Sequence, residues 1–159
     1  MKPDAMNITP RVEPATAADI EAMSGLLGEL FALESDFRPA PEKQRRGLRL
    51  ILEQPALGQL FVLRHDGQVI GMANALLTVS TAEGQQVVLL EDVIVKAGFR
   101  GQQLGRLLIK HVLDWAQARG LTRVTLLADQ DNAGALAFYR KLGFAPSAMC
   151  VWRKKLAAE

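Results

Sequence analysis

The sequence of 159 residues is poor in the features that mark secreted, membrane-bound or metal-dependent proteins. It contains one cysteine, Cys150, so no disulfide framework can form, and we expect a reduced compartment and a buried, structural thiol. No apolar run approaches the roughly 20 residues that a membrane-spanning helix needs, and the first ten residues lack the apolar segment of a signal peptide. We therefore expect a cytoplasmic protein that contacts no membrane and holds no metal.

An excess of one charge is also missing. The 19 basic and 17 acidic residues give a formal net charge of +2, and the two signs are interspersed without a block of like charge. Nucleic-acid binding relies on clustered basic residues, so nothing in the sequence calls for a nucleic-acid partner. The short basic run over residues 153–155 is expected to be the solvated end of a strand.

Internal repeats, low-complexity segments and changes in composition that would mark a linker are absent. A chain of this length can bury roughly 70% of its unfolded surface and so supports one hydrophobic core. We therefore predict a loose tail over residues 1–6 and a single domain over residues 7–159.

The first third of the chain predicts one strand and two helices. A strand over residues 8–12 precedes Thr16 and Asp19, which have the spacing of a capping box. After the first helix, a loop over residues 33–41 is rich in charge and proline, and a second helix is expected over residues 42–53. The apolar residues predicted on one face of the first helix are Ile20, Met23, Leu26, Leu27, Leu30 and Phe31.

From residue 59 onward the apolar period changes to that of β-strands. Apolar segments over residues 60–65, 68–79 and 86–95 are separated by short polar turns, and the turn Asp66–Gly67 favours a hairpin. This pattern predicts an antiparallel meander.

The last third of the chain alternates helices and strands. The expected elements are helices over residues 104–119 and 133–142, ended by Gly120 and Gly143, and strands over residues 123–128 and 149–156. A strand, a helix and a strand in succession form a right-handed crossover, which predicts a parallel strand pair in the sheet. The apolar face of the first of these helices comprises Leu104, Leu107, Leu108, Val112, Trp115 and Ala116, with His111 at its edge as a packing residue.

The segment from Val93 to Gly105, VIVKAGFRGQQLG, joins the end of an apolar strand to a helix through a basic turn that contains glycines. A helix N-terminus presents unpaired N–H groups and a partial positive charge, which suits a phosphate. Gly101 and Gly105 let the backbone approach closely, and Arg100 adds a charged fork. An ordinary strand-to-helix turn has the same pattern, so this stretch alone leaves both interpretations open.

Two motifs make the chain resemble the GCN5-related N-acetyltransferase (GNAT) family. The family's acetyl-CoA loop has Arg or Gln, two variable residues, Gly, a variable residue, then Gly or Ala; here it runs from Arg100 to Gly105 and departs at Gln103. A first helical turn needs no glycine, so we expect Gln103 to lie there with its N–H still able to donate, and phosphate contact to be weakened or shifted with binding retained. The second motif, N-x-x-A-x-x-F-Y-x-K-x-G-F, is matched from Asn132 to Phe144 at every fixed position.

The resemblance implies the acyl-CoA N-acyltransferase fold. This is an α+β, three-layer fold with a mixed, mostly antiparallel sheet, a splayed parallel strand pair and about four flanking helices. It also implies acetyl-CoA as co-substrate, with pantetheine between the two parallel strands. The cofactor-binding residues are then Val93, Ile94, Val95, Arg100, Gly101, Gln102, Gln103, Leu104, Gly105, Asn132, Ala135 and Phe138. From the residues alone, without the family resemblance, Asn132 is expected to cap a helix, Phe138 and Leu142 to belong to the core, and Tyr139 to be half-buried.

Acetyl transfer requires a neutral amine, yet an alkylamine with a pKa of about 10.4 is almost wholly protonated at pH 7. Glu91 is the candidate base, directly or through water, because apolar neighbours raise the pKa of a carboxyl. The segment LEDVIV also resembles the diamine-type acetyltransferases of the family, whose matching glutamate is the proposed base. Strand alternation is expected to send Asp92 to the other face. Tyr139 is the candidate acid that protonates the departing CoA thiolate.

Three functions are compatible with the fold that the sequence predicts, and they differ in how well the motifs support them. The first is acetyl transfer from acetyl-CoA to a primary amine of a small molecule or a protein, in a ternary complex and with no motif that identifies the acceptor. The alternative is a CoA- or acyl-CoA-binding module without turnover, acting as a sensor or a partner subunit. Nucleotide binding is disfavoured because the sequence has neither GxxxxGK[ST] nor GxGxxG. The family resemblance also favours a homodimer.

Overall fold

The computed structural model describes residues 9–34 and 38–157 and divides into two compact units, one ending at Leu127 and the other beginning at Ala128. The predicted tail over residues 1–6 lies outside the described residues. The single domain over residues 7–159 stays a prediction.

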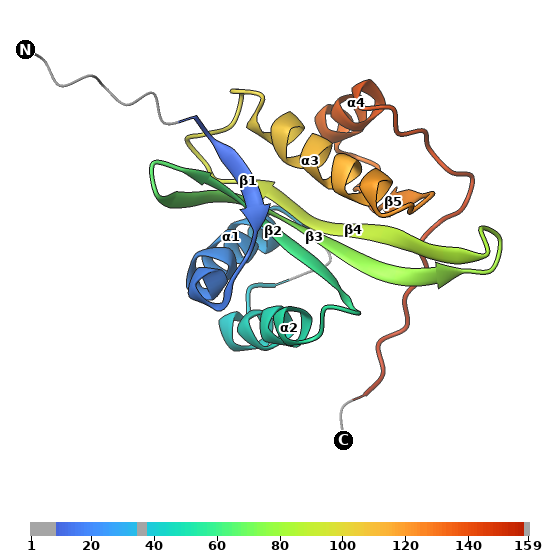
Figure 1. Cartoon of the computed structure of the whole chain (residues 1–159), viewed down its shortest axis with the longest axis horizontal. Helices are drawn as coiled ribbons and strands as arrows, with labels where there is room; N and C mark the ends of the chain where they lie inside the picture. Colours follow the sequence, from blue (N-terminus) through green and yellow to red (C-terminus); the bar gives the residue numbers. More distant parts are fainter. Residues whose placement is uncertain (1–8, 35–37, 158–159) are drawn as a thin grey trace, which may run out of the picture. The chain divides into compact units, whose positions relative to one another are not determined.

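The first unit is built on a five-stranded sheet flanked by helices (Figure 1). Its strands, in spatial as well as sequence order, are β1 (Arg11–Pro14), β2 (Gly58–His65), β3 (Gln68–Ser80), β4 (Gln85–Val95) and β5 (Val124–Leu126). Its α-helices are α1 (Ile20–Leu33), α2 (Pro41–Glu53) and α3 (Leu104–Ala118). Strands β1 to β4 pair antiparallel, whereas β4 and β5 pair parallel. The predicted meander and the parallel pair are both confirmed.

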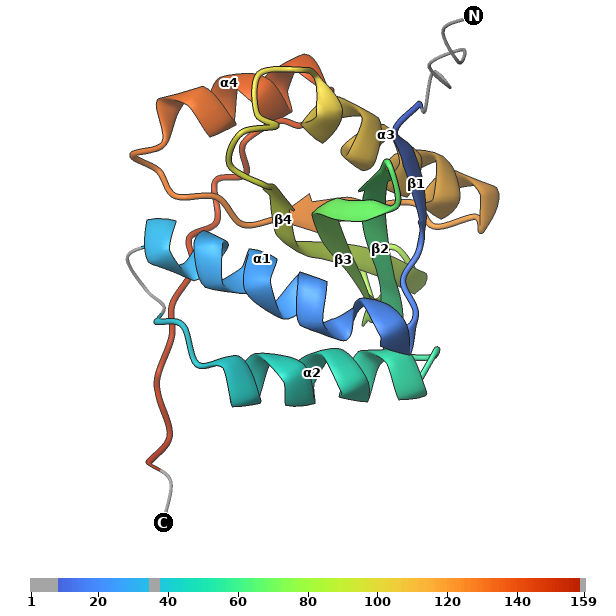
Figure 2. The same cartoon turned by 90° about the vertical axis from the view of Figure 1, so that its left-hand side faces the viewer.

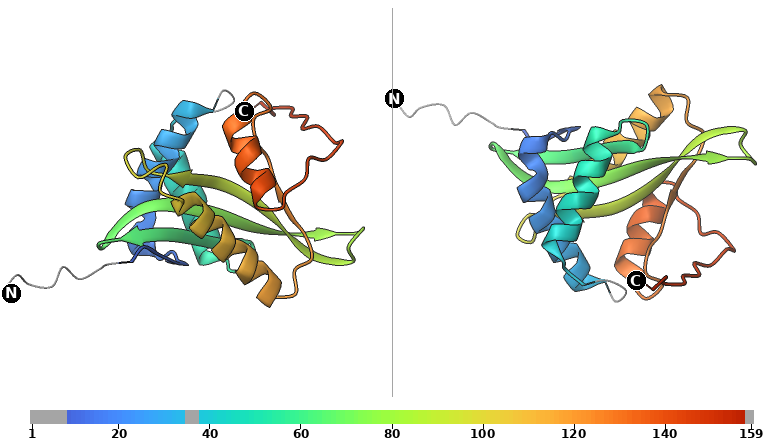
Figure 3. Two further views of the ribbon diagram at one scale, coloured as in Figure 1. Left: turned by 90° about the horizontal axis from the view of Figure 1, so that it is seen from above. Right: turned by 90° about the horizontal axis from the view of Figure 1, so that it is seen from below.

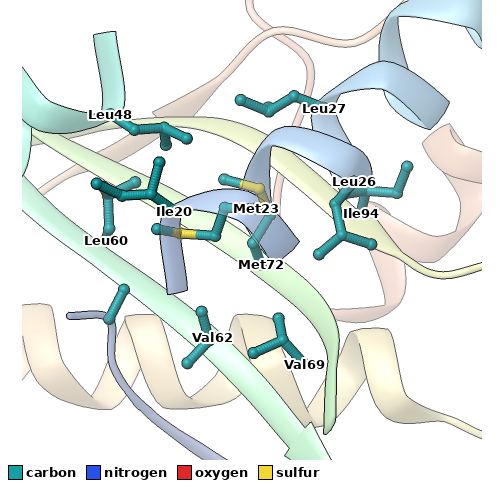
Figure 4. Packing of buried hydrophobic residues seen from close by; sticks show 11 residues of the cluster. Ile20, Met23, Leu26, Leu27, Leu48, Leu60, Val62, Val69, Met72 and Ile94 are labelled. Atoms are coloured by element: carbon teal, nitrogen blue, oxygen red, sulfur yellow. The ribbon is translucent and has the colours of Figure 1, made fainter. Parts of the chain in front are cut away.

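The main core lies where α1 and α2 cover one face of the sheet, and the two helices run side by side there (Figures 2 and 4). The buried members of this cluster are Ala15, Ile20, Met23, Leu26, Leu27, Leu48, Leu60, Val62, Val69, Met72 and Ile94. Leu30 and Phe31 pack partly against it, which confirms the predicted apolar face of α1. The capping box is also confirmed, because the Thr16 backbone N–H donates to the Asp19 carboxylate at 3.0 Å.

Helix α3 crosses the other face of the sheet (Figure 3). Phe61 of β2 contacts His111 and Trp115 of α3 edge-on, with ring centroids 5.4 Å apart in each pair, so His111 is a packing residue as predicted. Leu107, predicted on the apolar face, is instead 39% exposed, whereas Ile109 is buried. Leu108, Val112 and Ala116, one turn apart from each other, lie along the centre of the buried stripe of α3. Successive residues are rotated by about 100° around the helix axis, so Leu107 falls outside this stripe.

The second unit contains α4 (Ala133–Lys141). The Asn132 side chain accepts a hydrogen bond from the Ala135 N–H at 3.0 Å, which confirms the predicted N-cap. Tyr139 is half-buried as predicted and contacts Phe138 edge-on, with ring centroids 5.3 Å apart. The prediction that Phe138 and Leu142 belong to a core is wrong, because no residue of α4 is buried and both side chains are only half-buried.

The predicted strand over residues 149–156 is also wrong. Residues 142–157 contain neither helix nor strand, and Trp152 is 92% exposed. Cys150 is exposed, so the predicted buried thiol is wrong as well. A strand exists only when its backbone groups pair with a neighbouring strand, and this segment pairs with no strand of the described residues.

Candidate active site

Strand β4 carries a bulge directly after Glu91, because Ala73 of β3 lies opposite both Asp92 and Val93. Asp92 has a φ of 54°, in the left-handed region that aspartate tolerates better than most residues. A bulge bends its strand and breaks the alternation of side chains between the two faces of the sheet.

The bulge brings Glu91 and Asp92 to a shared neighbour, Asn74 of β3. Glu91 pairs with Asn74 across the strands, so the two side chains lie on one face. Asn74 also pairs with Leu60, which is buried in the α1–α2 core and identifies this face. The Asn74 Nδ2 donates to the Asp92 Oδ2 at 3.3 Å. The prediction that Asp92 points away from Glu91 to the other face is therefore wrong, because it assumed regular alternation.

Asp92 and Asn74 form a polar pair in which Asn74 is buried and Asp92 is half-buried. Burial raises the pKa of the Asp92 carboxyl above its ordinary value, and the hydrogen bond from Asn74 partly offsets that rise. Asn74 is 3% exposed, and its Oδ1 has no hydrogen-bond partner among the described residues. Asn74 was not among the residues predicted from the sequence, although a lone amide within an apolar strand is a signal for it. The raised pKa that the sequence predicted for Glu91 stays a prediction.

The connection from β4 to α3 ends at Gln103, which has φ 59° and ψ 19°. The prediction that Gln103 lies in the first helical turn is wrong, because these angles are left-handed. Glycine adopts this region without strain, whereas another residue is destabilised by roughly 1 kcal/mol. Gly101 has a φ of 82° and also requires the left-handed region.

Arg100 makes contacts with the protein itself. Its Nε donates to the carbonyl of Val95 at 2.9 Å, and its Nη2 lies 3.9 Å from the Oε1 of Glu29. Its side chain remains 46% exposed. The sequence predicted both Arg100 and the main chain of Val95 as cofactor contacts, and here the two contact each other.

The start of α3 has the chemistry of an anion site. The first N–H groups of an α-helix have no partner within the helix and attract negative charge. Gln102 and Gln103, just before the helix, are exposed, and a side chain at Gly101 would meet no atom within 4 Å. The segment from Gly101 to Gln103 is therefore exposed and open to a ligand.

The predicted site residues are divided between the two units. Those of the first unit follow one another along β4, the connection and the start of α3: Glu91, Val93, Ile94, Val95, Arg100, Gly101, Gln102, Gln103, Leu104 and Gly105. Those of the second unit lie at the start and middle of α4: Asn132, Ala135, Phe138 and Tyr139. The fold of each unit brings its own set together.

Within residues 9–34 and 38–157, no group of three or more His, Cys, Asp or Glu side chains could hold a metal ion. No helix in the same ranges is both long enough and apolar enough to cross a bilayer.

The family model of the acetyltransferase (GNAT) family matches residues 27–144, a range that includes the β4 bulge, the connection to α3 and all of α4. The chain belongs to the GNAT family. This confirms the resemblance that the Arg100 and Asn132 motifs indicated.

Curated GNAT relatives share the chain's sequence over different spans. Streptothricin acetyltransferase of Streptomyces lavendulae is 38% identical over 80 residues, which are 50% of this chain and 40% of that protein. In three further relatives the match covers 29–39% of their length, so the chain spans two fifths or less of these relatives. The IAA acetyltransferase of Azospirillum brasilense is 30% identical over 125 residues, 79% of this chain and 78% of that protein.

Solved structures share the fold. The aminoglycoside N-acetyltransferase AAC(6')-Iy, solved in complex with CoA, superposes with a TM-score of 0.80 over 96% of this chain and 99% of that one, at 20% identity. An α+β acyltransferase fold with a mostly antiparallel, five-stranded sheet is therefore confirmed.

Proposed function

We propose that this GNAT chain is an acetyl-CoA-dependent N-acetyltransferase that acts on a primary amine of a small molecule or a protein, by direct attack in a ternary complex. The observation that supports the proposal is the position of a carboxylate, Glu91, which pairs with Asn74 beside the β4 bulge and precedes the end of β4 at Val95. The match to the GNAT family model includes this strand and the connection that follows it.

The residues present fit CoA. Phosphate groups suit the backbone N–H groups between Gly101 and Gly105, where no side chain would block a ligand at Gly101. The family resemblance assigns the pantetheine arm to the main chain of Val93 and Val95, and the remaining contacts to Asn132, Ala135 and Phe138. CoA supplies the activated acetyl group as a thioester.

The chain's own side chains manage two protons. The amine nitrogen forms a bond to the acetyl carbon while the carbon–sulfur bond breaks. Glu91 accepts the proton that the ammonium must lose, directly or through water, and the Tyr139 hydroxyl donates a proton to the CoA sulfur. The nitrogen loses its second proton to solvent as the amide forms. Glu91 then releases its proton to solvent and Tyr139 takes one back, so the reaction releases one proton overall.

An amine panel tests this proposal. Streptothricin and aminoglycosides belong in it because comparison proteins are named for them, and diamines, amino acids and peptides with free amines cover the other classes. We expect at least one amine to accelerate thiol release from acetyl-CoA above the hydrolysis rate, and Glu91→Gln to abolish most of that acceleration. Binding of acetyl-CoA with no acceleration by any amine would contradict the enzyme proposal.

The second candidate is a CoA-binding module without turnover. The departure of Gln103 from the glycine of the family's acetyl-CoA loop is the observation that favours this module, and Gln103 is left-handed there. Restoring glycine there separates the two candidates: an enzyme gains turnover with affinity, whereas a module gains affinity alone.

A homodimer and a cytoplasmic location are further parts of the proposal. Both rest on resemblance to the family. Sedimentation equilibrium tests the first, and fluorescence microscopy of a tagged chain tests the second.

A further inference from the structure

Glu29 of α1 reaches across to the connection between β4 and α3. Its Oε1 accepts a hydrogen bond from the backbone N–H of Ala97 at 3.1 Å, and the same oxygen lies 3.9 Å from the Nη2 of Arg100. Glu29 and Ala97 are 68 residues apart in the sequence. One carboxylate oxygen of the helix therefore faces two residues of the segment that carries the acetyl-CoA motif.

The connection needs such contacts because its backbone is unusual. Gly98, Gly101 and Gln103 all have positive φ angles. Glycines have wide conformational freedom, so holding one such conformation opposes a large loss of backbone entropy. A loop that is already held in its binding conformation loses less entropy when a ligand arrives, and binds more tightly for that reason.

We propose that Glu29 is a positioning residue for CoA, which holds the connection over residues 96–103 in its phosphate-binding conformation through the Ala97 N–H. Arg100 then braces the connection from the protein side, and the backbone N–H groups between Gly101 and Gly105 bind the phosphates. This inference rests on the proposed acetyl-CoA site.

The two contacts of Glu29 differ in strength. The Glu29–Arg100 ion pair is long, and its side chains are 33% and 46% exposed, so solvent screens it and it contributes little. A backbone N–H that donates to a carboxylate is a charge-assisted hydrogen bond and is stronger. Positioning therefore depends on an acceptor oxygen at residue 29 more than on its charge.

The difference between these two contacts predicts which substitution at residue 29 weakens CoA binding more. Glu29→Gln keeps an oxygen that can accept from Ala97, whereas Glu29→Ala removes it. Glu21 is a matched control on the same helix, because it lines the same pocket of about 280 Å³ as Glu29 and is bound by Arg45 at 2.9 Å and 3.1 Å. Arg45 holds the Glu21 carboxylate, so Glu21→Ala removes an α1 charge and leaves the acceptor of the Ala97 N–H in place.

The experiment measures the affinity for CoA by calorimetry and the amide exchange of residues 96–103 in the free protein. We expect Glu29→Ala to bind CoA about tenfold more weakly, the loss expected for one charge-assisted hydrogen bond, and to exchange faster at residues 96–103 while α1 exchanges as before. Glu29→Gln should stay within about threefold of the unchanged protein, and Glu21→Ala within about twofold.

The outcomes separate this inference from the proposed function. If the unchanged protein binds no CoA, the proposed function fails, and the exchange rates still test whether Glu29 holds the connection. If it binds CoA and Glu29→Ala binds equally well, the positioning role is overturned while the proposed function stands. Faster exchange confined to α1 would also overturn it, because Glu29 would then stabilise only its own helix.

Discussion

The two units of the chain differ in what holds their elements in place. In the first, side chains such as Phe61 and Met23 are completely buried between the sheet and its helices. In the second, α4 has no buried residue and Trp152 is 92% exposed. Long-range packing fixes the first unit, whereas α4 depends on local signals, the Asn132 cap at its start and the left-handed Gly143 after its end.

The proposed chemistry is divided in the same way. Glu91 belongs to the packed first unit and Tyr139 to the second. If both carry a proton, each unit contributes one step of the reaction, and variants in the two units should share a kinetic signature although their effects on stability differ.

The largest expected effect is on turnover. Glu91→Gln and Tyr139→Phe should each lower kcat by about 10²- to 10⁴-fold, because each removes a proton-transfer group, and the affinity for acetyl-CoA should stay within about twofold. Steady-state thiol release and calorimetry give the two numbers. A loss of affinity as large as the loss of kcat in either variant would show that its residue binds the cofactor and does not transfer a proton.

The next effect separates the packed first unit from the second unit. Phe61→Ala should lower the free energy of unfolding by about 3–5 kcal/mol, because Phe61 is fully buried, whereas Phe138→Ala should lower it by about 1–2 kcal/mol. Urea unfolding followed by circular dichroism measures both. Equal losses would break the comparison, since they would mean that α4 packs as closely as β2.

The stability of the first unit should depend on pH through two carboxyls, those of Asp19 and Asp92. Burial alone would raise the pKa of Asp19, but hydrogen bonds from the Thr16 backbone N–H and from Arg64, at 3.0 Å each, hold it below its ordinary value. The ionised Asp19 carboxylate therefore stabilises the fold above about pH 4, and this stabilisation is lost as the pH falls through the pKa of Asp19 in the folded protein. Asp92 has the opposite sign, because burial raises its pKa, so stability falls as the pH rises through that pKa.

The free energy of unfolding of two variants, measured from about pH 3 to pH 7, checks these signs, because this range includes the ordinary carboxyl pKa values. Asp19→Asn should be less stable than the unchanged protein at pH 7, and the gap should close in acid. Asp92→Asn should be more stable at pH 7, and that gap too should close in acid. If both variants were less stable, or both more stable, than the unchanged protein at pH 7, the opposite pKa shifts of Asp19 and Asp92 would be contradicted.

The smallest expected effect is at the turn into α3. Gln103→Gly should raise the free energy of unfolding by about 0.5–1 kcal/mol, because glycine relieves the left-handed strain, and should tighten CoA binding. Gln102→Gly is the matched control, since its φ is not positive, and should lower stability by a similar amount. A decrease for both variants would show that Gln103 is unstrained.

Sequence patterns predicted the elements that depend on local or periodic signals. The face of α1 followed from helical spacing, the β2–β3 hairpin from Asp66–Gly67, which both have positive φ, and the cap of α4 from Asn132. The strand over residues 149–156 has a pattern as good as these. It failed because a strand also needs a neighbour, which no local pattern supplies.

The candidate site was predicted as a set of residues more fully than as a geometry. The family motif selected the residues from Arg100 to Gly105, and a carboxylate within an apolar strand selected Glu91; these assignments stay predictions. The bulge at Asp92 depends on how β4 pairs with β3, and alternation alone cannot show it. The contact between Glu29 and Ala97 likewise joins residues that no local pattern connects.

A calorimetric titration with acetyl-CoA, run beside ATP and NAD, tests the central claim most directly. We expect micromolar binding of acetyl-CoA and none of the other two, because the segment from Gly101 to Gln103 is exposed and lies within the range that the GNAT family model matches. Absence of acetyl-CoA binding, or equal binding of ATP or NAD, would contradict the claim that this chain is an acetyl-CoA-dependent enzyme.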